Sequence, residues 1–153
     1  MELVINEWFP EYCRPEATKE SRQMLQSFLE RFLQNDDVIC VRNPSPFLTK
    51  IYRYAKEYQS HSDTRSILIL SRFIKAVLLN SKKCKFITGE HDLDEVVLEK
   101  LSHGNYASDK YLFEAAVMTG SKIIITTDQR LYNHFRDIDV FTIVMLPDFL
   151  ANY

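Results

Sequence analysis

Two apolar runs near the C-terminal end of the chain constrain its fold more than any other sequence feature. KIIIT at 122–126 and VFTIVM at 140–145 lack the alternation of polar and apolar residues that marks a strand with one face in water. Continuous apolar strands are typical of parallel sheets that carry helices on both faces. We therefore expect both runs to lie in a sheet covered on two sides.

Three shorter apolar runs precede them, and segments with helical periodicity separate the runs. The three are LVI at 3–5, DVICV at 37–41 and CKFIT at 84–88. Between them, apolar residues recur at steps of three and four over 17–33, and Ser45-Pro46 is typical of the cap and first turn of a helix that runs to about Tyr58. This alternation predicts a three-layer α/β/α fold with a mostly parallel central sheet of about five strands.

Short signals mark the expected ends of other elements. Asp63 is a candidate cap for a helix that continues to Leu78, and Ser108 is a candidate cap for a helix over 109–119. Gly120 fits the left-handed backbone position that often ends a helix. Pro10 interrupts the segment after the first run, so we expect an irregular connection there.

The composition indicates one globular domain over residues 1–153, with 46% hydrophobic and 26% charged residues. The net charge of −2 creates no overall basic field, so any affinity for nucleic acid must come from a local patch or from metal ions. Three widely spaced cysteines beside apolar residues favour reduced structural thiols in a cytoplasmic protein. No apolar stretch approaches the roughly 20 residues that cross a bilayer, so we expect neither secretion nor membrane insertion.

Asp109 and Asp128 stand at joints between expected elements. Asp128 follows the strand KIIIT and Thr127, and Asp109 opens the helix before that strand. Because parallel sheets bind ligands at the carboxyl ends of their strands, we expect the two carboxylates to converge at one edge. Carboxylates without histidine or cysteine partners suit Mg²⁺ or Mn²⁺, which can activate water and clamp phosphodiester oxygens. The alternative is that each aspartate only caps a helix N-terminus.

The same region resembles a known family. It combines an aspartate at a helix start, apolar and small helix residues, a glycine, and a strand that ends in Thr-Asp: Asp109, Leu112, Ala115 or Ala116, Gly120 and KIIITTDQRL. This pattern is similar to the C-terminal half of PIN-domain proteins, and VFTIVMLPDFL resembles their last strand and its exit. The resemblance is fairly specific over 84–150 and covers 1–60 only by the order of elements. It implies a PIN-like endoribonuclease that hydrolyses RNA with Mg²⁺ or Mn²⁺, since PIN domains are typically metal-dependent ribonucleases built around three or four acids.

The resemblance assigns roles position by position. Asp109 and Asp128 fill two of the family's acidic positions and are expected to bind the metal. The usual aspartate after the first strand falls on Asn6, whose amide oxygen can still bind a metal, with Glu7 beside it. The usual glutamate of the helix after the second strand falls near Thr49-Lys50, where no acid stands.

A fourth acid is expected from the loop after CKFIT. Asp92 lies in GEHDLD, which should reach the same edge of the sheet, and it completes a predicted catalytic set with Asp109, Asp128 and Asn6. Further acids, each with an ordinary surface position as its alternative, are Glu7, Glu57 and Glu114.

Basic side chains supply the expected contacts to substrate. Lys50, Arg53 and Lys56 lie on one side of their helix, with tyrosines between them. We expect Lys50 and Arg53, together with Thr127, to bind the phosphates of RNA while the tyrosines stack on bases. The alternative is a solvated basic face with the tyrosines partly in the core.

Two other functions remain open. The departures from the acidic pattern also fit a PIN-like domain that has lost catalysis and acts as an RNA-binding or protein-assembly module. A different α/β binding domain, for example for nucleotides, gains no support, because the glycines at 89, 104 and 120 are isolated and form no phosphate-binding loop. The family resemblance also allows a homodimer or a protein partner, although no residue pattern points to one.

Overall fold

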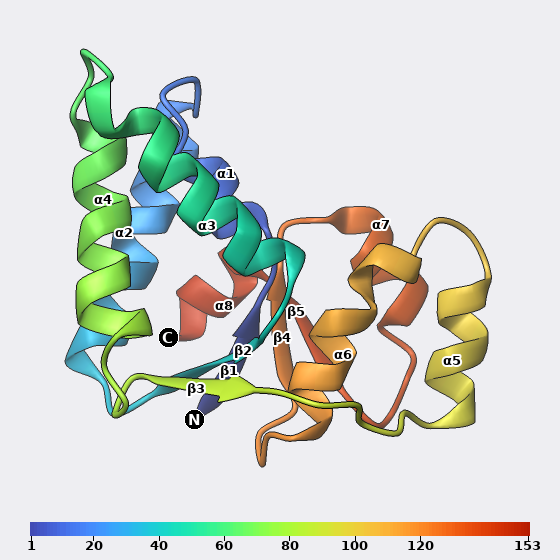
Figure 1. Ribbon diagram of the computed structural model, residues 1–153. Coiled ribbons are helices and arrows are strands. Elements are labelled where there is room, and N and C mark those ends of the chain that lie inside the picture. The colour runs from blue at the N-terminus through green and yellow to red at the C-terminus, as the bar shows by residue number, and fades with distance from the viewer.

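The computed structural model describes residues 1–153 and contains one five-stranded sheet in which all neighbouring strands are parallel (Figure 1). The strand order is β3-β2-β1-β4-β5. The strands are β1 (Glu2–Ile5), β2 (Val38–Arg42), β3 (Cys84–Ile87), β4 (Ile123–Thr126) and β5 (Thr142–Met145). Each lies at a run expected to be a strand, so the predicted three-layer α/β/α fold is confirmed.

Eight α-helices cover the sheet. They are α1 (Trp8–Tyr12), α2 (Lys19–Gln34), α3 (Pro46–Glu57), α4 (Arg65–Phe73), α5 (Glu95–Ser102), α6 (Lys110–Val117), α7 (Gln129–Phe135) and α8 (Leu146–Asn152). In Figure 1, α1 to α4 and α8 gather on one side of the sheet and α5 to α7 on the other. Helix α6 packs on β1 and β2, while α8 packs on α2. None of these helices is both long and apolar enough to cross a membrane.

Of the two predicted helix caps before α3 and α4, the one at Ser45 is confirmed. The Ser45 hydroxyl accepts the backbone N–H of Leu48 at 3.3 Å at the start of α3, and proline occupies the first turn. At the start of α4 the N-cap residue is Thr64, whose side chain makes no capping bond, and Asp63 lies one residue before it, where its Oδ1 accepts the backbone N–H of Arg65 at 3.1 Å. The helix then continues past α4 as the π-helical turn η2 (Ile74–Leu78), so its expected end is also confirmed.

The expectations around α6 are wrong at both ends. Ser108 does not cap the helix, because it lies in the 3₁₀ turn η3 (Ala107–Asp109) that precedes α6. Gly120 does not adopt the left-handed conformation. In the turn between α6 and β4, Lys122 is the residue with a positive φ, of 51°. The turn is held instead by Glu2, whose Oε2 accepts the backbone N–H of Gly120 at 2.7 Å.

The segment after β1 is helical rather than irregular. Pro10 lies in the first turn of α1, where backbone N–H groups have no helical partner to lose. Trp8 and Phe9 are buried, and Trp8 Nε1 donates to the carbonyl of Ile125 at 3.0 Å. This bond ties α1 to the end of β4 and fixes the path of the chain beside that edge. The three cysteines are free and buried.

Candidate functional site

The strand order reverses between β1 and β4. The chain continues from β1 to β2 on one side of this point and from β4 to β5 on the other. Open parallel sheets bind ligands at such a switch point, beyond the carboxyl ends of the strands. Ile5 pairs with Ile125 in the ladder between β1 and β4, which brings the next residues, Asn6 and Thr126, into contact there.

A buried hydrogen-bond network joins the two strand ends. The Asn6 Nδ2 group donates to Thr126 Oγ1 at 2.8 Å, and the same oxygen accepts the backbone N–H of Asp128 at 3.0 Å. Asn6 and Thr126 are both buried. The Asn6 Oδ1 atom receives only a long contact of 3.4 Å from the backbone N–H of Trp8. The amide oxygen therefore keeps capacity to bind another group.

Asp128 caps α7 with one of its two carboxylate oxygens. Its Oδ1 accepts the backbone N–H groups of Arg130 at 2.8 Å and Leu131 at 3.2 Å. The capping alternative is thus correct for this oxygen. The side chain is otherwise exposed, and Oδ2 has no hydrogen bond within the chain. One oxygen of Asp128 orients the carboxylate while the other is available to a ligand.

Asp109 occupies the residue before α6 but makes no capping bond with its side chain. It is half-buried, and its pKa is raised to about 6, first by burial and then by the negative charges of Glu7 and Asp128. These carboxylates come from the end of β1, the start of α6 and the start of α7. The charges of Glu7 and Asp128 therefore act on Asp109, although the three residues belong to different elements.

Tyr111 places an unpaired hydroxyl beside these acids. The residue is 8% exposed, and its hydroxyl is buried with no hydrogen-bond partner. Burial raises the pKa of Tyr111, and the charges of Glu7 and Asp109 raise it further. A buried phenol without an acceptor is a donor that a bound oxygen atom could satisfy.

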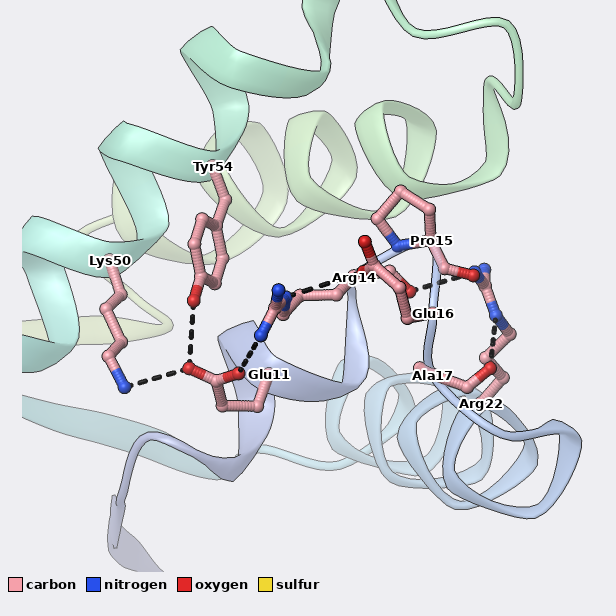
Figure 2. Close-up of polar contacts among 8 residues, drawn as sticks. All are labelled: Glu11, Arg14, Pro15, Glu16, Ala17, Arg22, Lys50 and Tyr54. Carbon is pink, nitrogen blue, oxygen red and sulfur yellow. Dashed lines mark hydrogen bonds and ion pairs between the residues drawn. The ribbon is translucent and has the colours of Figure 1, made fainter.

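Lys50 points from α3 toward Glu11 of α1 (Figure 2). Its Nζ atom lies 2.8 Å from Glu11 Oε1 and 3.3 Å from Glu7 Oε1. Burial opposes the charged form of Lys50, but the two carboxylates outweigh it and raise its pKa. A cation with two carboxylate partners thus stands near the place where the family resemblance expects a glutamate. Whether Lys50 also binds RNA phosphates stays a prediction.

Arg53 and Thr127, the other residues expected to bind substrate, have fewer contacts. Arg53 is exposed, and its guanidinium carbon lies 5.1 Å from the centre of the Tyr54 ring. Thr127 is half-buried, and its hydroxyl makes no hydrogen bond within the chain. The threonine that organises the site is its neighbour Thr126.

Asp92 is not brought into this group. It is exposed and lines a separate hollow of about 350 Å³ together with Arg42, Glu90, His91, Leu93, Leu98, Lys110 and Glu114. Its charge is not among those that raise the pKa of Asp109. Glu114 also has another role, since its Oε2 accepts from Arg42 Nε at 3.0 Å with both side chains largely buried.

No three histidine, cysteine, aspartate or glutamate side chains are arranged as a group that could hold a metal ion. Glu7 forms an ion pair with Lys50, and Asp128 uses one carboxylate oxygen to cap α7. The acids therefore do not form a closed set of metal ligands. The largest hollow, about 610 Å³, lies elsewhere, between α2 and α4, and its charged lining residues are Lys19, Arg22 and Arg65.

The sequence pattern did not clearly indicate three residues of the site. Glu7 was named only as a further acid with an ordinary surface position as its alternative, and Thr126 and Tyr111 were not singled out. Thr126 ends a strand beside Asn6, so its position on the ladder was the available signal. Nothing in the local sequence marks Tyr111, because its significance depends on the absence of a partner in the folded chain.

Comparison with known proteins identifies no relative. No family model matches the chain, and neither the curated proteins nor the solved structures include a match. The function proposed below therefore depends on the geometry and chemistry of the site itself.

Proposed function

We propose that the protein is a PIN-like endoribonuclease that hydrolyses RNA phosphodiesters with Mg²⁺ or Mn²⁺. One observation carries the proposal: Glu7, Asp109 and Asp128 come from three elements at the carboxyl ends of β1 and β4 and the start of α6, and the charges of Glu7 and Asp128 raise the pKa of Asp109. Mutual repulsion of this kind is a cost in the absence of a cation and favours binding one.

The chemical types of the side-chain donors suit a hard divalent cation. The side-chain donors are carboxylate and amide oxygens, without histidine or cysteine. Mg²⁺ usually keeps several waters and binds through one or two carboxylates plus substrate phosphates, so a closed set of protein ligands is not required. The unpaired Tyr111 hydroxyl beside Glu7 and Asp109 supports a further oxygen atom at this place.

Asp109, Asp128 and the Asn6 amide oxygen would hold the cation. When bound, the cation supplies positive charge to phosphodiester oxygens and a water of lowered pKa. Thr126 keeps Asn6 and Asp128 at a fixed separation through its two hydrogen bonds. Arg53, and Lys50 where it is free of its carboxylates, would bind phosphates of the RNA chain.

The test is cleavage of labelled single-stranded and hairpin RNAs with Mg²⁺ or Mn²⁺. Asp109→Asn and Asp128→Asn are each expected to reduce the cleavage rate at least ~100-fold, because each removes a metal ligand. Asp139→Asn is the matched control, since Asp139 is an exposed aspartate without an ion pair. A folded wild-type chain that cleaves no RNA with either metal would overturn the proposal.

A second candidate is a PIN-like module that binds RNA or a protein without catalysis. The ion pair of Lys50 with Glu7 favours it, because one acid of the site is already neutralised by the chain. RNA that is retained intact by wild type and released after Arg53→Gln would support this candidate. For either candidate, the free buried cysteines support a cytoplasmic location.

A further inference from the structure

The largest hollow of the chain collects cationic side chains. It has a volume of about 610 Å³ and lies between α2 and α4, beside the connection that joins α1 to α2. Its charged lining residues are Lys19, Arg22 and Arg65, and no acid lines it. A hollow of this volume is within the range of pockets that bind small ligands. The three cations make it a candidate site for an anion.

Backbone carbonyl groups alone hold the Arg22 guanidinium at the wall of this hollow. Figure 2 shows it beside the carbonyls of Pro15 and Ala17, which accept from its Nη2 at 2.9 Å and from its Nε at 3.5 Å. The carbonyl of Arg14 also accepts from Nη2, at 2.9 Å, while Nη1 is buried without an acceptor. Arg22 takes part in no ion pair of the chain. Because carbonyl groups are neutral, they orient the guanidinium and leave its positive charge without a counter-charge.

The acids closest along the chain do not neutralise these cations. Asp63 is paired with Arg65, whose Nη2 atom lies 2.7 Å from Asp63 Oδ2. Glu20, the acid in the first turn of α2, does not line the hollow. Lys19 and Arg22 therefore remain as two unpaired cations in the first turn of α2, where the positive end of the helix dipole disfavours them. An anion in the hollow would offset both charges.

An apolar wall adjoins the cations. Leu68 is 63% exposed and lines the hollow together with Ile69 and Pro15. Gln23 and Gln26 also line it, and their amide groups can both donate and accept hydrogen bonds. Pockets for small ligands combine apolar surface with a few polar groups that fix the ligand's orientation. The hollow therefore suits a ligand with an anionic group and an apolar or ring-shaped body.

We propose that this hollow binds a small phosphate monoester, with the phosphate close to Lys19 and Arg22 and the body of the ligand against Leu68. A phosphate monoester carries a charge of about −1.5 to −2 at neutral pH, which matches two unpaired cations better than the single charge of a carboxylate. Arginine and lysine are both common partners of phosphate. The proposal does not depend on the proposed nuclease function, because no lining residue of the hollow belongs to the site around Asp109 and Asp128.

The experiment is calorimetric titration of the full chain with phenyl phosphate, inorganic phosphate and benzoate, without divalent cations. Phenyl phosphate is expected to bind most tightly, because inorganic phosphate lacks the apolar body and benzoate lacks the second charge. Arg22→Gln is expected to weaken the binding of phenyl phosphate at least ~10-fold, since it removes a cation that is fixed in place. Lys19→Gln should weaken it about 3-fold, as expected for an exposed charge. Lys56→Gln is the matched control, because Lys56 is exposed, has no ion pair and lies outside the hollow, and it should leave the affinity unchanged.

Two results of this titration would overturn the proposal: no binding of phenyl phosphate by wild type at millimolar concentrations, or equal affinity in wild type and folded Arg22→Gln. Arg22 also holds three backbone carbonyls, so its substitution could prevent folding. If circular dichroism shows that Arg22→Gln does not fold, Leu68→Glu replaces it, since it places a negative charge on an exposed side chain of the hollow and is held to the same loss of affinity. A phosphotyrosine peptide carries the same phenyl phosphate group on a chain. Tighter binding of that peptide than of phenyl phosphate would indicate a docking site for a protein and would contradict the small ligand.

Discussion

Asp109 and Glu11 are two partly buried carboxylates near one edge of the sheet, and their pKa values shift in opposite directions. Burial works against ionisation of both. At Asp109 the neighbouring charges are the carboxylates of Glu7 and Asp128, and the pKa rises to about 6. At Glu11, hydrogen bonds from Lys50 and Tyr54 and the charge of Lys50 outweigh burial and lower the pKa. The comparison shows that counter-charge, more than burial, separates a satisfied acid from one that is poised to bind a cation.

The largest effect on stability is expected from removal of the Thr126 hydroxyl, which links Asn6 to Asp128. Thr126→Val removes the oxygen that accepts from both Asn6 and Asp128, and leaves the buried Asn6 amide and the part-buried Asp128 N–H unpaired. The free energy of unfolding should fall by about 1–3 kcal/mol. Urea denaturation measures this change. Thr127→Val is the matched control and should change stability by less than about 0.5 kcal/mol, because its hydroxyl makes no bond; equal losses in both variants would contradict the role given to Thr126.

Removing the charge of Asp109 should stabilise the metal-free protein at neutral pH. The folded-state pKa lies above the ordinary value of about 4, so the folded chain holds the proton more tightly and loses stability as pH rises from about 4 to about 6. Asp109→Asn avoids this loss, and we expect a gain of about 1–2 kcal/mol at pH 7 after allowance for solvent screening. The gain should be small at pH 4. The measurement is denaturation of wild type and Asp109→Asn across this pH range. If Asp109→Asn were less stable than wild type at pH 7, the contrast between the pKa shifts of Asp109 and Glu11 would be wrong.

The corresponding change at Glu11 should have the opposite sign. Its pKa is lowered on folding, so its contribution is fully present at neutral pH, begins to decline as pH falls below the ordinary glutamate value, and is lost as pH falls through the lowered folded-state pKa. Glu11→Gln should therefore destabilise the chain at pH 7 by roughly 1 kcal/mol, since the side chain is one third exposed. The same denaturation series tests it. A penalty that persists unchanged at pH 3 would indicate lost packing rather than lost ion pairs.

The smallest effect on stability is expected at Arg53. Its guanidinium is exposed and has no acidic partner, so Arg53→Gln should change the free energy of unfolding by less than about 0.5 kcal/mol. Affinity for single-stranded RNA should fall a few-fold, and its salt dependence should weaken by about one phosphate contact. Fluorescence anisotropy at several salt concentrations measures both. Unchanged affinity at every salt concentration would contradict the prediction that Arg53 binds RNA phosphates.

The strands were the most predictable part of the molecule. KIIIT and VFTIVM have no polar alternation, and this local property already requires cover on both faces. The rule for carboxyl ends of parallel strands also predicts that Asp109 and Asp128 lie at the same edge, and the effect of the Asp128 charge on the pKa of Asp109 agrees with this prediction. The expectations that were wrong involve contacts between distant segments: Glu2 holds the turn at Gly120, and Trp8 ties α1 to β4.

The pattern of residues along the chain was enough to predict the layered parallel fold and the edge of the sheet at which the two aspartates stand. Periodicity and apolar strand runs are local properties of the sequence, so they do not depend on how individual side chains pack. Which side chains join the aspartates there was set by the packing of segments far apart in sequence. Lys50 reaches Glu7 only because α3 lies against α1, and Tyr111 lacks a partner only in the folded core. Electrostatic interactions depend on distances of a few ångströms and on shielding from water, and neither quantity exists until the layers have packed.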